Sequence, residues 1–316
     1  MTLTRSSGAA ETEASVSGSP ASGSHNLMAI AFMAIAMTLF AFSDMLIKLA
    51  SSDVGVGQIL TIQSAISIAY FGLICWKRKE RVSRAALVSA PVLIRNFGEV
   101  VGILSFVTAL TLIPISNASA ILQATPLALT LGAALFLKEP VGWRRWSAVA
   151  VGFAGMLIIV RPGMEGFDQA SLLAVVAVFA FAARDLGTRA TSASISTEMI
   201  ALVASICVGL AAIVLQTTTG EWTAMQPRIL AMVLTASVLG VAGFHCLLVG
   251  VRNGEVSVVA PFRYVRIIAA IGIGFVVFGE EPSIYTYAGT LLIAASGLYT
   301  LYREQIVRNR ARETAQ

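Results

Sequence analysis

Apolar residues run along this chain in ten long blocks separated by short polar segments. Each block has about the ~20 residues that a helix needs to cross a bilayer. The predicted membrane spans are 27–50, 56–76, 92–113, 116–137, 143–160, 170–190, 196–216, 229–251, 255–278 and 283–301. Because a backbone in lipid must satisfy its own hydrogen bonds, such segments form helices rather than isolated strands. The pattern therefore predicts an all-α integral membrane protein.

The composition of the 316 residues fits this prediction, since 57% are hydrophobic and only 12% are charged, far from the fractions of soluble domains. The net charge of +5 lies in short clusters between the apolar blocks, which favours membrane lipids over nucleic acid as a partner. Cysteine spacing offers no metal site, and a Walker A loop, HExxH and GxSxG are absent from the sequence. We expect no enzyme activity, metal or cofactor.

The chain divides into two tails and two halves of five spans each. Residues 1–26 are rich in Ser, Gly, Ala and Thr, a composition that cannot bury enough surface to fold, and we expect a disordered cytoplasmic tail. The first repeat is predicted at 27–161 and the second at 162–303. Residues 304–316 are expected to form a basic cytoplasmic tail.

The two halves resemble each other at a shift of about 142 positions. The Leu-Lys-Glu-Pro of 137–140 falls on the Gly-Glu-Glu-Pro of 279–282 and, with a one-residue gap, Asp44 and Lys48 fall on Asp185 and Arg189. Because five is an odd number of spans, the second copy must cross the membrane in the opposite sense. Inverted repeats are a recurrent transporter architecture, with the substrate near the midplane between the halves.

Lysine and arginine in the short loops predict the orientation, because cytoplasmic loops carry an excess of both. The segments on one side contain Lys77, Arg78, Lys79, Arg81, Arg84, Lys138, Arg144, Arg145, Arg184, Arg189 and Arg252. The opposite loops contain only Arg161 and Arg228. This asymmetry predicts that both termini are cytoplasmic.

Two pairs of ionisable residues lie inside predicted spans, where a charge costs ~2.5–3.5 kcal/mol at mid-bilayer. Arg95 and Glu99 are four positions apart in the third span, and Asp44 and Lys48 share this spacing in the first. Residues at this spacing lie on one helical face. Either pair could face a substrate cavity; alternatively, Arg95 and Glu99 form an ion pair that only makes the helix insertable, and Lys48 extends toward the membrane surface.

The ninth span opens with Ala-Pro-Phe-Arg-Tyr at 260–264. Pro261 removes a backbone donor, which can break the helix and free polar backbone groups for a ligand. Arg263 and Tyr264 are therefore candidate substrate ligands. Arg266 lies three positions beyond Arg263 on the same surface, and the alternative is that one of these arginines binds lipid phosphates.

Uncharged or titrating polar residues complete the candidate substrate-binding set: Asn117 and Gln123 in the fourth span, Gln63 in the second and His245 in the eighth. Their side chains can both donate and accept hydrogen bonds. Hydrogen bonds between helices, without a role in transport, are the alternative. His245 and Glu99 are candidates for a titrating group if transport is coupled to protons.

Several stretches beyond the first tail carry a family likeness. They include Ile-Pro at 113–114, Asn-Ala-Ser-Ala-Ile-Leu-Gln at 117–123, Leu-Lys-Glu-Pro-Val-Gly-Trp-Arg-Arg-Trp at 137–146, Arg-Pro-Gly at 161–163 and Ala-Arg-Asp-Leu at 183–186. These stretches resemble the EamA-type drug/metabolite transporter superfamily, and within it the bacterial riboflavin-uptake branch, near S-adenosylmethionine-uptake carriers. The chain departs from that branch at Gln63, Ala269, Phe275 and Arg266, where the branch tends to carry Arg, two Trp and a small polar residue.

The resemblance implies a carrier of the cell inner membrane that moves riboflavin or a related planar metabolite by alternating access. Rings for stacking could come from Phe97, Phe106 and Phe262. An exporter of amino acids, nucleosides or other metabolites and S-adenosylmethionine uptake stay open as alternatives, as does a homodimer as the working unit. An integral-membrane enzyme or a lipid flippase is disfavoured, because the sequence has only two His and no cluster of catalytic groups.

Overall fold

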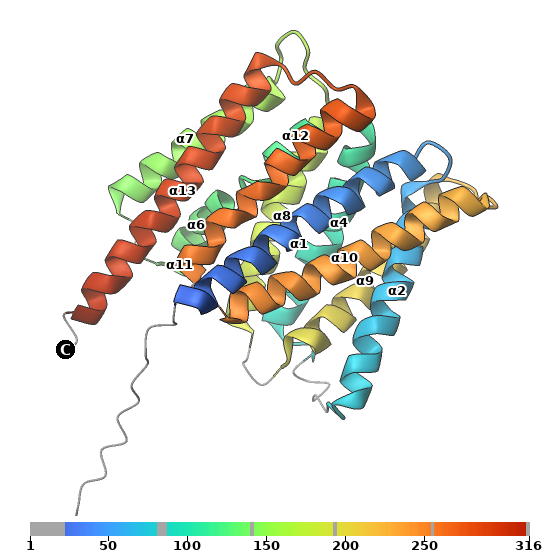
Figure 1. Ribbon diagram of the computed structural model, residues 1–316, viewed down its shortest axis with the longest axis horizontal. Helices are drawn as coiled ribbons and strands as arrows, with labels where there is room; N and C mark the ends of the chain where they lie inside the picture. Colours follow the sequence, from blue (N-terminus) through green and yellow to red (C-terminus); the bar gives the residue numbers. More distant parts are fainter. Residues whose placement is uncertain (1–22, 81–86, 140–141, 192–194, 254–255, 314–316) are drawn as a thin grey trace, which may run out of the picture.

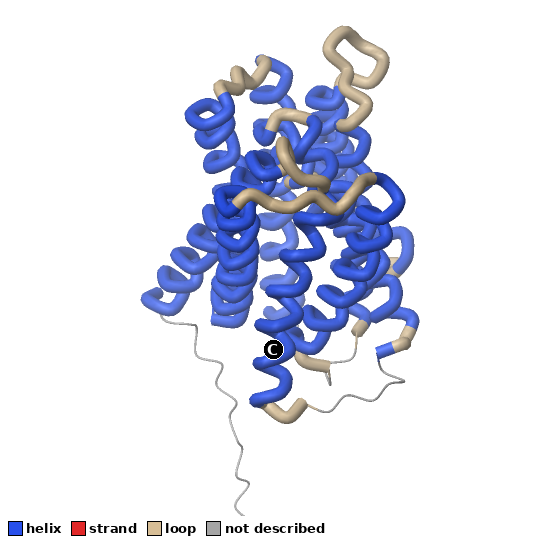
Figure 2. Tube along the Cα trace, turned by 90° about the vertical axis from the view of Figure 1, so that its right-hand side faces the viewer, coloured by secondary structure: helices blue, strands red, loops and turns tan. Residues whose placement is uncertain are grey.

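The computed structural model of the chain describes residues 23–80, 87–139, 142–191, 195–253 and 256–313, and the regular elements among them are all helices (Figure 2). They are α1 (Gly23–Ala50), α2 (Val56–Lys77), α4 (Ala90–Leu112), α5 (Ile115–Leu122), α6 (Thr125–Phe136), α7 (Trp143–Val160), α8 (Ser171–Ala190), α9 (Thr197–Thr219), α10 (Pro227–Asn253), α11 (Val256–Val259), η1 (Ala260–Tyr264), α12 (Val265–Phe278) and α13 (Ile284–Glu313).

Ten helical stretches of the described chain are long and apolar enough to cross a membrane, and the predicted spans agree with them to within five residues. Large apolar side chains such as Trp76, Phe136 and Val276 are exposed on their outer faces. Exposed apolar surface on this scale is unfavourable in water and suits contact with lipid. The prediction of an all-α integral membrane protein is confirmed.

The helices at the two chain ends extend into the predicted tails. Helix α1 already begins at Gly23, within the segment 1–26 that was expected to be disordered, and residues 1–22 lie outside the described part. Helix α13 continues to Glu313, so most of the segment 304–316 is an extension of the last span. The first residues of α1 and the last of α13 lie at the same end of the bundle (Figure 1).

The two halves interlock through four main helix pairs. Helix α1 packs on α10 and α8 on α4, which matches the first span of each half with the third span of the other. The second spans, α2 and α9, pack together, as do the fifth spans, α7 and α13 (Figure 1). This reciprocal pairing is what two copies of opposite orientation produce around a pseudo-two-fold axis.

Glycines bring the paired helices into close contact. A Cβ atom on Gly98 of α4 would lie 2.5 Å from the carbonyl oxygen of Ala180 in α8. A Cβ atom on Gly155 of α7 would lie 2.8 Å from the carbonyl oxygen of Gly289 in α13, and a Cβ atom on Gly289 would lie 2.4 Å from that of Gly155. Small residues at such positions let membrane helices approach backbone to backbone.

The fourth span of each half is broken: 116–137 was predicted without a break, whereas a break at Pro261 in 255–278 was among the expectations. In the first half, α5 ends at Leu122 and α6 begins at Thr125, because Pro126 has no N–H for the carbonyl of Leu122. The Thr125 hydroxyl donates to that carbonyl instead, at 2.6 Å. In the second half the short pieces α11 and η1 precede α12, and Pro261 lies in the first turn of η1.

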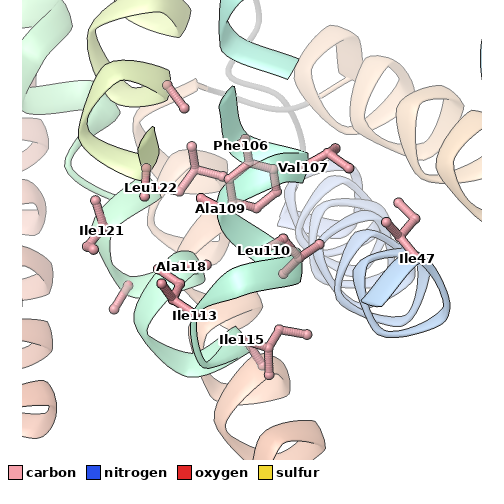
Figure 3. Close-up of a cluster of buried hydrophobic side chains, with 14 of the residues drawn as sticks. Ile47, Phe106, Val107, Ala109, Leu110, Ile113, Ile115, Ala118, Ile121 and Leu122 are labelled. Atoms are coloured by element: carbon pink, nitrogen blue, oxygen red, sulfur yellow. The ribbon is translucent and has the colours of Figure 1, made fainter. Parts of the chain in front are cut away.

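A large cluster of buried apolar side chains fills the space where α1, α4 and α5 meet (Figure 3). Ile47, Leu110, Ile113, Ile115 and Ile121 are each at most 4% exposed. Helix α4 ends here because Pro114 restricts Ile113 to an extended conformation. The core therefore fixes the junction between the third and fourth spans, next to the polar contacts described below.

Candidate functional site

A chain of four charges joins α4 to α8, and we call it the α4–α8 charge cluster: Arg95, Glu99, Arg184 and Asp185. Glu99 lies 3.4 Å from Nη2 of Arg95, its neighbour one turn away, and 3.6 Å from Nη1 of Arg184. Nε of Arg184 donates to Asp185 at 2.9 Å. The Arg184 guanidinium also stacks 4.6 Å from the centroid of the Phe181 ring. Opposite charges thus alternate along the cluster, which lowers the cost of placing them in a membrane.

Arg95 is the most fixed member of the α4–α8 charge cluster. Its side chain is 9% exposed, and Nη1 donates to Oδ1 of Asn96 at 3.1 Å and to the carbonyl oxygen of Ile200 at 3.3 Å. The contact with Ile200 ties α4 to α9, whereas the link to α8 runs through Glu99 and Arg184. Its Nε is buried and has no hydrogen-bond partner among the described residues, so Arg95 keeps one unused donor.

A second buried ion pair joins α1 to α12. Nη2 of Arg266 donates to Oδ2 of Asp44 at 2.6 Å, and the two side chains are 16% and 8% exposed. The guanidinium also lies 5.3 Å from the ring centroid of Phe106 and 5.6 Å from that of Phe40. Arg266 is therefore paired inside the protein, and binding of this arginine to lipid phosphates is the wrong interpretation.

Lys48 closes one end of the bundle together with Glu280. Nζ of Lys48 donates to the carbonyl oxygens of Leu110, at 2.9 Å, and of Ile113, and lies 4.0 Å from Oε1 of Glu280. The side chains of Lys48 and Glu280 are 15% and 12% exposed. Extension of Lys48 toward the membrane surface is therefore the wrong interpretation.

The Glu280 carboxylate caps the first turn of α5. It accepts from the backbone N–H of Ile115 at 2.8 Å and from the N–H and hydroxyl of Ser116 at 3.3 Å and 3.0 Å. These N–H groups have no partner within their own helix, and a carboxylate is the favoured group at a helix N-terminus. Glu280 lies in the loop between α12 and α13, and it thus links this loop of the second repeat to the broken fourth span of the first.

A hydrogen bond joins the two broken spans. Nε2 of Gln123, at the break between α5 and α6, donates to the backbone carbonyl oxygen of Arg263 in η1 at 2.7 Å. The half-buried side chain of Arg263 makes no hydrogen bond or ion pair within the described residues. Asp185 attracts its charge, whereas Arg184 repels it. The junction therefore presents an unpaired cation beside the α4–α8 charge cluster.

The structure places the other predicted ligands apart from this junction or in packing roles. The Tyr264 hydroxyl is buried next to Gly297 and has no hydrogen-bond partner within the described ranges. Oδ1 of Asn117 accepts from the hydroxyl of Thr286 in α13 at 2.9 Å. Nδ1 of His245, on an exposed part of α10, lies 3.2 Å from the hydroxyl of Tyr70, and Gln63 is half-buried in α2 without a hydrogen bond among the described residues.

Sequence reasoning missed three residues that carry these contacts: Arg184, Asp185 and Glu280. Arg184 was counted with the loops, but it lies inside α8. Two signals were available in the sequence. Arg184 and Asp185 are adjacent inside a predicted span, and Glu280 belongs to the second Glu-Pro turn. The ring expected from Phe97 is not at the junction, because its side chain is 71% exposed and lines an apolar groove between α4 and α8.

Among the described residues, no group of three or more His, Cys, Asp and Glu side chains could hold a metal ion. The polar groups instead form ion pairs and hydrogen bonds that cross between the two halves, as in Gln123 to Arg263 and Lys48 to Glu280. Ten spans in two inverted halves, with charged residues and two broken helices between them, define a membrane transporter of small molecules.

Comparison with known proteins gives the family. The chain belongs to the EamA-like transporter family, whose model matches residues 27–161 and 169–302, and it is a multi-pass membrane protein. It is 29% identical over 234 residues to the riboflavin transporter of Rhizobium johnstonii, covering 72% of this chain and 71% of that one.

Two further comparisons widen the range of cargoes and support the fold. The chain is 26% identical over 213 residues to the S-adenosylmethionine uptake transporter of Rickettsia conorii, covering 67% of this chain and 72% of that one. One crystal structure superposes with a TM-score of 0.57 at 17% identity, covering 88% of this chain and 98% of the other. At this identity the superposition concerns the fold alone.

Proposed function

We propose that this transporter takes up a small ring-bearing metabolite by alternating access, with riboflavin as the first candidate cargo, and that both termini are cytoplasmic. The observation that carries this proposal is the junction of the two broken spans, where Gln123 fixes the backbone of Arg263 and leaves its guanidinium unpaired. In inverted-repeat transporters, broken helices of this kind meet at the substrate.

The chemistry of the junction suits the polar edge of a flavin. The pyrimidine edge of the isoalloxazine ring presents carbonyl acceptors and one N–H, and the Arg263 guanidinium supplies donors in a fixed fork. Carboxylate oxygens of Glu99 and Asp185, on the α4–α8 charge cluster, can accept from hydroxyl or N–H groups of a solute. Similarity to a riboflavin transporter supports the same cargo.

S-adenosylmethionine is the second candidate. Its carboxylate would pair with Arg263, and its ammonium group would be attracted to the carboxylates of Glu99 and Asp185. Similarity to an S-adenosylmethionine uptake transporter supports this alternative. An exporter of another metabolite would use the same junction in the opposite direction.

Uptake of radiolabelled riboflavin by riboflavin-auxotrophic cells tests the proposal. Arg263→Gln removes charge-assisted hydrogen bonds, worth ~1.5–3 kcal/mol, so we expect uptake at low substrate concentration to fall roughly 10- to 150-fold. Arg228→Gln is the matched control, because Arg228 is exposed and far from the junction in the sequence. Unlabelled S-adenosylmethionine as competitor separates the two cargoes; absence of riboflavin uptake by a well-expressed protein would refute the first candidate.

A further inference from the structure

The contact between Lys48 and Glu280 has a counterpart at the opposite end of the bundle. In the structure the Glu-Pro turns match at a shift of 141 positions rather than the 142 read from the sequence, because Lys138 and Gly279 share a left-handed conformation, and Glu139 and Glu280 each donate a backbone N–H to the residue six positions earlier. This shift places Lys48 on Arg189, Glu139 on Glu280 and Ser116 on Ser257. In the structure, Nη1 of Arg189 lies 3.9 Å from Oε1 of Glu139. Both pairs thus join a basic residue at the end of a first span to the Glu-Pro turn that precedes a fifth span.

The two pairs lie at opposite ends because successive spans alternate in direction. Helix α1 ends, at Ala50, on the side of the bundle where α5 begins. Helix α8 ends, at Ala190, on the side where α6 ends. Figure 1 shows the ends of α1 and α12 at one end of the bundle, and the ends of α6 and α13 at the other. A substrate pathway between the two halves, as in other inverted-repeat transporters, would have one of these ion pairs at each mouth.

The two mouths differ in closure although their chemistry is equivalent. The side chains of Lys48 and Glu280 are 15% and 12% exposed, and each makes further hydrogen bonds, to backbone carbonyls and to the first turn of α5. The side chains of Arg189 and Glu139 are 48% and 42% exposed, and among the described residues neither makes another side-chain contact. Equivalent residues thus hold one mouth shut and leave the other solvated.

Two inverted copies of one fold can exchange their conformations, and this exchange opens one side as it closes the other. We propose that Lys48–Glu280 and Arg189–Glu139 are the two alternating gates of the pathway: both ion pairs are formed, the first is enclosed and the second solvent-exposed in this structure, and these states exchange during transport. This proposal rests on the proposed carrier function, and it concerns the conformational cycle rather than the cargo.

The gates can be followed without cargo by a single reporter cysteine. Ser119 lies one turn beyond Ser116 on the same face of α5, is fully buried, and its hydroxyl has no hydrogen-bond partner in the described part of the chain. With the three native cysteines replaced by alanine, Ser119→Cys should react with an impermeant maleimide only when the Lys48 mouth opens. Ser52→Cys, exposed at the same end, shows which membrane vesicles present this mouth to the reagent.

Three glutamate variants make the test specific. Glu280→Gln removes the charge that holds Lys48, so we expect the labelling rate to rise roughly tenfold, the value of one charge-assisted hydrogen bond. Glu139→Gln weakens the opposite closed state, so the rate should fall in the parent and in the Glu280→Gln background. Glu281→Gln, the adjacent exposed glutamate, should leave the rate unchanged.

The opposite signs distinguish gating from general loosening of the fold. A Glu139→Gln change that raises labelling, or that does not reduce it in the Glu280→Gln background, overturns the proposal, as does a Glu280→Gln rate equal to that of the parent. Thermal unfolding of each purified variant shows whether it is folded. Because labelling is measured without cargo, failure of riboflavin uptake would refute the first candidate cargo and leave the gates standing.

Discussion

Removing one partner of the Asp44–Arg266 pair should cost far more stability than removing both. The atoms Nη2 and Oδ2 are 2.6 Å apart, and the side chains are only 16% and 8% exposed. Two unit charges about 4 Å apart attract by ~4 kcal/mol at an effective dielectric constant near 20. Leaving one of them buried and unpaired costs roughly 3–5 kcal/mol.

We therefore expect Asp44→Asn and Arg266→Met each to lower the free energy of unfolding by roughly 3–5 kcal/mol. The double variant should lose less than about 2 kcal/mol, because replacing a whole buried ion pair by uncharged groups is often nearly neutral. The flexible Met side chain can keep contact with the rings of Phe106 and Phe40, on which the arginine now lies.

Unfolding of the purified protein in detergent, followed by tryptophan fluorescence, measures the four proteins of this double-mutant cycle. Asp53→Asn is a matched control, because Asp53 is exposed near the end of the same helix. If the costs of the two single substitutions add in the double variant, Asp44 and Arg266 are not coupled and the reasoning is refuted.

Two further predictions concern packing and orientation. Gly98→Ala puts a Cβ 2.5 Å from the carbonyl oxygen of Ala180, so α4 and α8 must separate, and we expect the free energy of unfolding to fall by about 1–3 kcal/mol. Gly272→Ala, whose Cβ would have no neighbouring atom within 4 Å among those compared, should be neutral in the same unfolding assay. Equal losses for the two variants would contradict the packing. With cytoplasmic termini, Met164→Cys should react with an impermeant maleimide on intact cells and Lys138→Cys only after lysis, in a cysteine-free background; the reverse result would invert the orientation.

The spans could be predicted from the sequence because each is an unbroken apolar block with its own hydrogen bonds. Of the two breaks in the fourth spans, the one at Pro261 was anticipated from the sequence and the one at Pro126 was not. Only the structure shows that the Thr125 hydroxyl and the amide of Gln123 provide partners for the freed polar groups. Such partners come from side-chain directions and neighbouring helices, which periodicity along one chain does not contain.

The charge partners divide in the same way. The pair Arg95–Glu99 follows from helical geometry, since four residues make about one turn, and the structure brings these two side chains together. The pairing of Glu99 with Arg184, and of Asp44 with Arg266, depends on which helices are neighbours. One-dimensional spacing could not supply this, although the internal repeat already matched Asp44 with Asp185.

The cap that Glu280 places on α5 has a consequence for biosynthesis. The N–H of Ile115 and the carboxylate that accepts from it are 165 residues apart in the chain. At about 5–20 residues per second, the ribosome delivers the acceptor roughly 10–30 s after the donor. During this interval the newly inserted fourth span has an uncapped first turn, so the first five spans wait for the last two before their folding is complete.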